Sequence, residues 1–230
     1  MKPCNLSIGK YQLQNSNHGA NMATAHEGKE VQPVIDFKQI CIHFADQILW
    51  RASDQPQERL TEPDKLLRFA GRVGILEEGE LNYLRERMAE NPIEAQAALE
   101  RAKAVREATY HILFAVANHM PQDPAHVALL NEAVAEAQDQ MHLVPGKPGD
   151  SFEWRWKSDK PQFDVVLWTA ARSVADLLTS EELKKVKSCP GEGCAYLFMD
   201  LSRNGKRRWC EMDVCGNRNK VTRFRQSHHR

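Results

Sequence analysis

The sequence lacks any apolar stretch long enough to cross a membrane, because nowhere do about eighteen apolar residues follow one another. Its first residues also lack the apolar core of a signal peptide. The chain also has no net charge at pH 7, because 31 Lys and Arg residues balance 31 Asp and Glu residues. We therefore expect a cytoplasmic protein, and the total charge neither favours nor excludes a nucleic-acid partner.

Motifs of common enzyme classes are also absent. The sequence contains no glycine-rich phosphate-binding loop and no nucleophile elbow. Several histidines are scattered singly: His43, His111, His119, His126 and His142. Lone histidines among helices are more often structural than catalytic. We therefore expect a binding protein and not an enzyme.

Charge is distributed unevenly along the chain. Residues 184–230 contain twelve Lys and Arg residues against four acids, a net charge of +8, so the remainder carries −8. An acidic globular domain joined to a basic binding module would show this asymmetry. At 230 residues, of which 42% are hydrophobic, the chain has room for both parts.

The spacing of apolar residues predicts a mainly helical domain over residues 34–180. It follows an arm, 1–33, which is rich in Asn, Gln, His and Gly and which we expect to be poorly ordered. Helices are expected over 34–51, 61–71, 81–88, 93–119, 126–140 and 163–178, and one β-hairpin over 141–144 and 152–156.

Four of the six cysteines lie close together in the basic region, as two Cys-x4-Cys pairs: Cys189, Cys194, Cys210 and Cys215. In a reducing compartment such a cluster indicates metal binding. Four thiolates fill a tetrahedron and leave no open position, so we expect one structural zinc per chain. A [2Fe-2S] cluster, two disulfides or unrelated free thiols are the alternatives. The other two cysteines are expected to be an exposed thiol, Cys4, and a buried core thiol, Cys41.

Between and after the cysteine pairs, the sequence predicts a small zinc finger with its own core. Residues 195–200 are strand-like, 202–205 form a turn, and the basic segment 206–209 is expected to return as a second strand. A short basic helix should follow Cys215, with Val221 and Phe224 facing the hairpin. Its other faces carry cations that would bind phosphate: Arg218, Lys220, Arg223 and Arg225.

Two segments in this region, Leu201-Ser-Arg-Asn-Gly-Lys-Arg-Arg-Trp-Cys210 and Cys215-Gly-Asn-Arg-Asn-Lys220, closely resemble the bacterial CGNR zinc-finger family. In that family the finger follows a helical, ligand-sensing domain called ABATE, and the proteins are described as stress-induced transcriptional regulators. The resemblance implies an ABATE-like domain over 34–180 and a finger over 184–230. It also implies that the four cysteines bind zinc and that basic side chains contact nucleic acid: Arg203, Arg207, Arg208, Arg218 and Lys220. Lys206, in the same basic segment, is a further candidate contact.

The sequence thus favours a DNA-binding transcriptional regulator whose helical domain senses a small molecule or dimerises. An RNA-binding zinc ribbon is the first alternative, in which Trp209 would stack on bases. A zinc module that docks onto a protein is the second. Four tryptophans could line a ligand pocket, although core packing is their more common role: Trp50, Trp154, Trp156 and Trp168.

Overall fold

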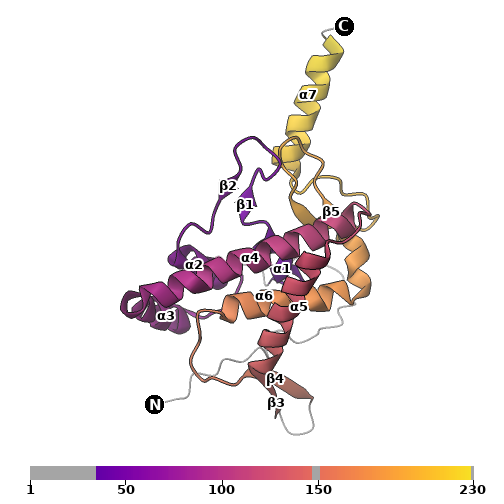
Figure 1. Ribbon diagram of the computed structural model, residues 1–230. Helices are drawn as coiled ribbons and strands as arrows, with labels where there is room; N and C mark the ends of the chain where they lie inside the picture. The colour runs from indigo at the N-terminus through magenta and orange to yellow at the C-terminus, as the bar shows by residue number, and fades with distance from the viewer. Residues whose placement is uncertain (1–34, 147–150, 229–230) are drawn as a thin grey trace, which may run out of the picture.

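The computed structural model describes residues 35–146 and 151–228 of the chain, and Figure 1 shows their arrangement. The arm expected over 1–33, with Cys4, therefore lies outside the described residues. The described part is mainly helical, with small antiparallel sheets of two strands each and a compact C-terminal cysteine cluster. The fold class expected from the sequence is confirmed.

The helices and strands follow one another along the chain in this order. The larger part of the chain contains α1 (Phe37–Ala45), β1 (Ile48–Leu49), β2 (Gln57–Glu58), α2 (Pro63–Arg72), α3 (Glu78–Glu90), α4 (Pro92–Ala117), α5 (Pro124–Asp139), β3 (Met141–Pro145), β4 (Phe152–Trp156) and α6 (Val165–Leu178). The C-terminal part contains η2 (Glu181–Lys185), β5 (Val186–Ser188), β6 (Leu197–Met199), η3 (Met212–Gly216) and α7 (Asn217–His228).

Local sequence signals explain where several helices begin. Asp36 and Asp123 cap α1 and α5 by accepting hydrogen bonds from Lys38 N and Ala125 N. Proline is the first residue of α2, α4 and α5, where its fixed φ suits the helix and its missing N–H costs nothing. The expected hairpin is present as β3 and β4, with Met141 opposite Trp156.

The first helix is shorter than the sequence suggested. A helix was expected over 34–51, but α1 ends at Ala45, and the chain continues into the ribbon of β1 and β2. Trp50 follows β1 with a positive φ of 52°, a conformation that an α-helix cannot contain. The apolar residues after Ala45 therefore serve this ribbon and not a helix.

The main core lies where α6 passes α1, α4 and α5. Side chains such as Phe44, Leu99 and Val174 are fully buried there. Cys41 is also fully buried, as expected, and burial raises the pKa of its thiol to about 12. Among the described residues, no helix is both long enough and apolar enough to span a bilayer.

This core extends into the C-terminal part of the chain. Val186 of β5 and Leu197 and Met199 of β6 belong to the same apolar cluster as the helices, and the two strands pack against α4. The sequence suggested that the finger and the helical domain have separate cores. The finger has a small cluster of its own around the cysteines, which includes Phe198, but its strands also join the main core. A sheet of two three-residue strands has too little surface for a core of its own, so it uses the face of the helices.

Candidate functional site

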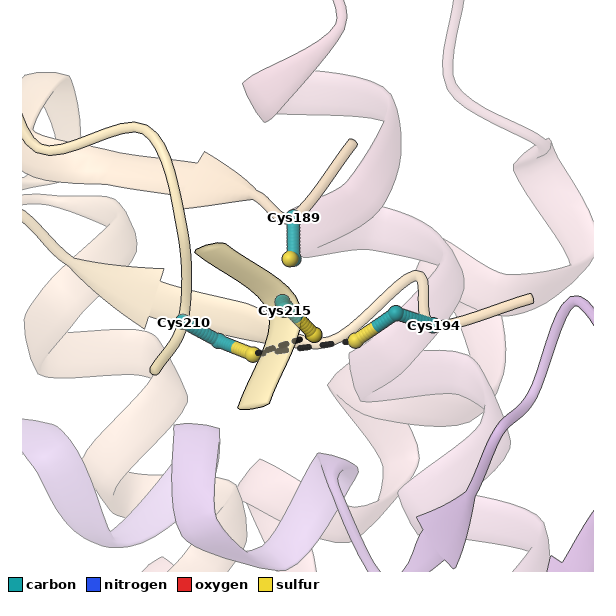
Figure 2. Close-up of side chains that lie close together, drawn as sticks. All are labelled: Cys189, Cys194, Cys210 and Cys215. Carbon is teal, nitrogen blue, oxygen red and sulfur yellow. Dashed lines mark hydrogen bonds between the residues drawn. The ribbon is translucent and has the colours of Figure 1, made fainter. Parts of the chain in front are cut away.

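Four cysteine sulfurs converge at the C-terminal end of the chain (Figure 2). The Sγ atoms of Cys189, Cys194, Cys210 and Cys215 all lie within 4.8 Å of one another. Cys210 Sγ is 3.6 Å from Cys194 Sγ and 3.7 Å from Cys215 Sγ. A tetrahedral zinc ion with Zn–S bonds of about 2.3 Å separates its sulfurs by about 3.8 Å. The four side chains therefore fit one structural zinc ion.

The backbone of residues 189–196, which we call the zinc knuckle, presents the first two sulfurs. Cys189 N donates to Tyr196 O at 2.7 Å, and Cys194 N donates to Gly191 O at 2.9 Å. Gly191 lies against the cluster, since a Cβ atom there would be 3.1 Å from Cys215 Sγ. The glycine thus leaves room for a fourth sulfur beside the loop.

The electrostatics of the cluster also call for a cation. Hydrogen bonding from Cys210 lowers the pKa of Cys194 to about 5, whereas the neighbouring Cys194 sulfur raises the pKa of Cys210 far above the usual thiol range. Burial, followed by the nearby Cys194, raises the pKa of Cys215 to about 12. One thiolate therefore opposes ionisation of the others, and a divalent ion would remove that repulsion.

The segment that carries Cys210 differs from the sequence expectation. Residues 206–209 do not form a strand, and β6 pairs instead with β5, with Val186 opposite Met199. The carboxylate of Asp200 folds the segment back by accepting from Ser202 N at 3.0 Å, Arg207 N at 2.9 Å and Lys187 Nζ at 2.5 Å. Hydrogen bonds from Lys187 and Ser202 hold the pKa of Asp200 well below its usual range. A side chain, and not a strand ladder, therefore organises this loop.

The helical part of the chain holds the zinc knuckle in place. Tyr110 of α4 donates a hydrogen bond from its hydroxyl to Ala195 O at 2.9 Å. Leu197 N donates to Asp46 Oδ1 at 3.1 Å, and Ala52 N donates to Gly193 O at 3.2 Å. These bonds come from three separate segments of the helical part. They hold the knuckle and the start of β6 against the helical part of the chain.

Residues 38–181 match the ABATE family, whose description is "putative stress-induced transcription regulator". The match covers more than half of the chain. The chain belongs to the ABATE family. Residues 185–228 match the CGNR zinc finger, which agrees with the four converging sulfurs and with one structural zinc ion. No curated protein matches the chain.

An ionic network in the ABATE domain supports the bond from Tyr110. Arg51 pairs with Glu107 at 2.5 Å, and its guanidinium carbon lies 3.8 Å from the centre of the Tyr110 ring. Arg106 is almost fully buried and pairs with both Glu58, at 2.6 Å, and Glu107, at 2.9 Å. The pKa of Glu107 is lowered because hydrogen bonds and charge from Arg51 and Arg106 outweigh the effect of its burial.

The C-terminal helix of the CGNR finger, α7, extends away from the rest of the molecule (Figure 1). It packs against η3 at its base. Val221 and Phe224 were expected to face a hairpin, but 49% and 63% of their surfaces are exposed. The expectation failed because residues 206–209 form no strand and α7 points away from the rest of the molecule.

Most of the basic side chains expected to contact nucleic acid are exposed: Arg203, Lys206, Arg207, Arg208, Arg218, Lys220 and Arg225. Arg223 lies within α7, but the structure does not describe its side chain. Arg207 has partners within the finger, since its guanidinium donates to the carbonyls of Trp209 and Cys210 and lies over the Phe198 ring. Within the described part of the chain, the other six exposed cations form no ion pair.

Sequence reasoning did not identify two residues that join the ABATE domain to the finger, Trp50 and Tyr110. Trp50 packs against the cysteine cluster, and Arg218 lies over its ring, with 4.2 Å between the guanidinium carbon and the ring centre. Both aromatic residues lie far from the finger in sequence, so no local pattern could have placed them there. Trp209 is half-buried against the same cluster, as a packed tryptophan would be.

Proposed function

We propose that this protein is a DNA-binding transcriptional regulator and not an enzyme, with α7 as the main nucleic-acid contact. The observation that carries the proposal is a projecting helix whose described cations, Arg218, Lys220 and Arg225, are exposed and without ion pairs among the described residues. Lys220 and Arg225 can therefore replace the counterions of a phosphate backbone, and Arg218 can do so once it leaves the Trp50 ring. The family's description as a transcription regulator supports the same function.

Duplex DNA suits this helix better than RNA does. The major groove of B-DNA admits an α-helix, whereas the major groove of A-form RNA is too deep and narrow for side chains to read. Single-stranded RNA is usually held by exposed aromatic side chains that stack on bases. Trp209 is half-buried against the zinc cluster, with the Arg208 guanidinium 5.5 Å from its ring centre, so it makes a poor stacking platform.

A titration with salt tests the proposal. The affinity of the zinc-loaded protein for a mixed-sequence duplex and for a single-stranded RNA of the same length would be measured between low and moderate salt. We expect tighter binding to the duplex and a linear fall of log affinity with log salt concentration, steeper with each phosphate contacted. Equal or absent binding at low salt would contradict the proposal.

The exposed apolar residues of α7 favour a second candidate, docking onto a protein. Val221 and Phe224 are largely exposed on the helix, and Met212 at its base is 56% exposed. Exposed large apolar side chains that gather on one element often mark a protein interface. This candidate differs from the first because it predicts no salt-sensitive binding to nucleic acid.

We further propose that the ABATE domain regulates the finger in response to a small-molecule effector. The shared core and the contacts of Trp50 and Tyr110 support this proposal, because a change in the ABATE domain would reach the finger directly. The bound state would be detected as a change in DNA affinity on addition of the effector. A finger that binds DNA identically in all effector-loaded states would contradict it.

A further inference from the structure

A cleft separates α7 from the ABATE domain. It has a volume of about 820 Å³ and lies between the loop 50–54, the zinc knuckle and the inner face of α7. The face of α7 that enters the cleft carries Arg218, Val221, Thr222 and Arg225. Clefts of this size at the junction of two units are common sites for small ligands.

Trp50 forms an aromatic wall of the cleft, and the structure holds it firmly. Its φ of 52° is strained for a residue with a side chain, and a turn in which Ser53 N donates to Trp50 O at 2.8 Å maintains it. Its side chain also packs against the zinc cluster. The indole is thus fixed by the same contacts that attach the finger.

The position of Arg218 shows that the Trp50 indole can bind a cation. Its guanidinium carbon lies 4.2 Å from the Trp50 ring centre, which is a cation–π contact between the finger and the ABATE domain. Arg218 is exposed and Trp50 is half-buried, and both line the open cleft, so a competing cation can reach the ring.

The rest of the cleft lining favours a cation as well. Three carboxylates line it, from Asp54, Glu192 and Asp213, against two guanidiniums, from Arg218 and Arg225. In the described part of the chain none of these carboxylates forms an ion pair. A ligand with a phosphate group would meet these acids, whereas a cationic ligand would be attracted by them.

We propose that the cleft binds a small organic cation with a flat or methylated head, a guanidinium or a quaternary ammonium, which replaces Arg218 on the face of Trp50. The displaced Arg218 becomes available to a phosphate on the outer side of α7. This second step rests on the proposed nucleic-acid function. The binding site itself does not depend on it.

The site can be tested by the NMR signal of the Trp50 indole N–H in the zinc-loaded protein, assigned from the spectrum of Trp50→Phe. Arginine amide and tetramethylammonium are the probes, urea is the neutral flat control, and sodium chloride matches the ionic strength. We expect a saturable shift of the Trp50 signal with either cation and none with urea or salt. A shift that never saturates, an equal response to urea, or saturation by adenosine monophosphate in place of the cations would overturn the proposal.

Two matched variants separate displacement from simple attraction. Arg218→Ala and Arg225→Ala each remove one exposed charge from the cleft, but Arg218 alone of the two lies over Trp50. We expect Arg218→Ala to bind the cations about two- to fivefold more tightly than Arg225→Ala does, the factor that an exposed cation–π contact is worth. Equal affinities in the two variants would show that Arg218 does not compete, and the proposal would fail.

The link to nucleic acid needs a separate measurement. Saturating arginine amide should raise the affinity for duplex DNA relative to sodium chloride of equal ionic strength, and the increase should vanish in Arg218→Ala. If the Trp50 signal responds but the protein binds no duplex at all, the site stands and the proposed function fails. If the duplex binds and the Trp50 signal does not respond, the proposed function stands and the cation site fails.

Discussion

The hydroxyl of Tyr110 donates a hydrogen bond to the carbonyl oxygen of Ala195, a residue 85 positions further along the chain. Ala195 directly follows the zinc ligand Cys194 and has a positive φ of 54°. The longest helix described, α4, therefore holds the zinc knuckle directly beside one of its zinc ligands. Burial of the tyrosine in this position raises its pKa to about 12.

Changing Tyr110 to Phe should loosen the knuckle. The substitution leaves the Ala195 carbonyl without its donor, which should lower the free energy of unfolding by about 1–2 kcal/mol. Urea denaturation of the zinc-loaded protein measures this loss. Tyr83→Phe is the matched control, because within the described residues its hydroxyl makes no hydrogen bond. Equal losses in the two variants would show that the bond to Ala195 contributes nothing.

Removing one zinc ligand should destabilise more than the finger. Cys210→Ser removes one of the four zinc ligands. Without the metal, β5 and β6, whose side chains belong to the main core, are no longer held in place. A loss of about 4 kcal/mol would lower the Tm of the whole protein by about 10 °C. Calorimetry with metal analysis, which should find one zinc per parent chain, measures both effects. Cys4→Ser should keep its zinc, and an unchanged Tm for Cys210→Ser would show that the finger unfolds independently of the main core.

The ionic network around Glu107 should make stability depend on acid pH. The pKa of Glu107 in the folded protein lies below its ordinary value of 4.5, so its stabilising effect is complete above pH 4.5 and is lost as the pH falls through the lowered value. Glu107→Gln should cost about 1 kcal/mol at pH 7, a modest value because the side chain is about one-third exposed. Denaturation at neutral pH and at a pH well below 4.5 should show the difference becoming smaller in acid. A constant difference would assign the effect to packing.

The close approach between the knuckle and loop 50–54 can be tested at Gly193. This glycine has a φ of 72°, and a Cβ atom would lie 3.1 Å from Ser53 Cβ. Gly205 is the control, since its φ of 59° is similar and nothing lies within 4 Å of its Cβ position. Both alanine variants should cost about 1–2 kcal/mol of unfolding free energy for backbone strain, and Gly193→Ala should cost more. Equal losses would mean that Ser53 moves away freely.

Replacement of Arg225 should reduce the salt dependence of DNA binding. If Arg225 contacts a phosphate, Arg225→Ala should lower the magnitude of the slope of log affinity against log salt by about 1, alike for all duplex sequences. Arg68→Ala removes an exposed charge, paired with Asp64, from α2 and serves as the control for net charge. A slope that changes equally in both variants would exclude a specific contact at Arg225.

The sequence predicted the zinc ligands and most helices because both follow from local spacing. Two Cys-x4-Cys pairs indicate a metal site directly. The helical spacing of apolar residues in α4 and α6 predicts which faces of these helices are buried. The family resemblance was also confirmed. These features need no knowledge of distant contacts.

The errors arose where distant segments meet. The segment 206–209 has the residues of a strand, but β5 already pairs with β6 and Asp200 binds the turn. Val221 and Phe224 are spaced as a buried pair, yet α7 has no hairpin beside it. Periodicity shows which residues share a face, but it does not show what lies opposite that face.

The extension of one apolar core across both family matches has an evolutionary consequence. The ABATE match ends at residue 181 and the CGNR match begins at 185, so recombination could readily join such segments in new combinations. A chimaera that carried this finger behind a foreign domain would bring Ala195 without Tyr110 and Arg218 without Trp50. We therefore expect such a chimaera to hold its zinc knuckle less firmly than this chain does, unless the foreign domain supplies equivalent contacts.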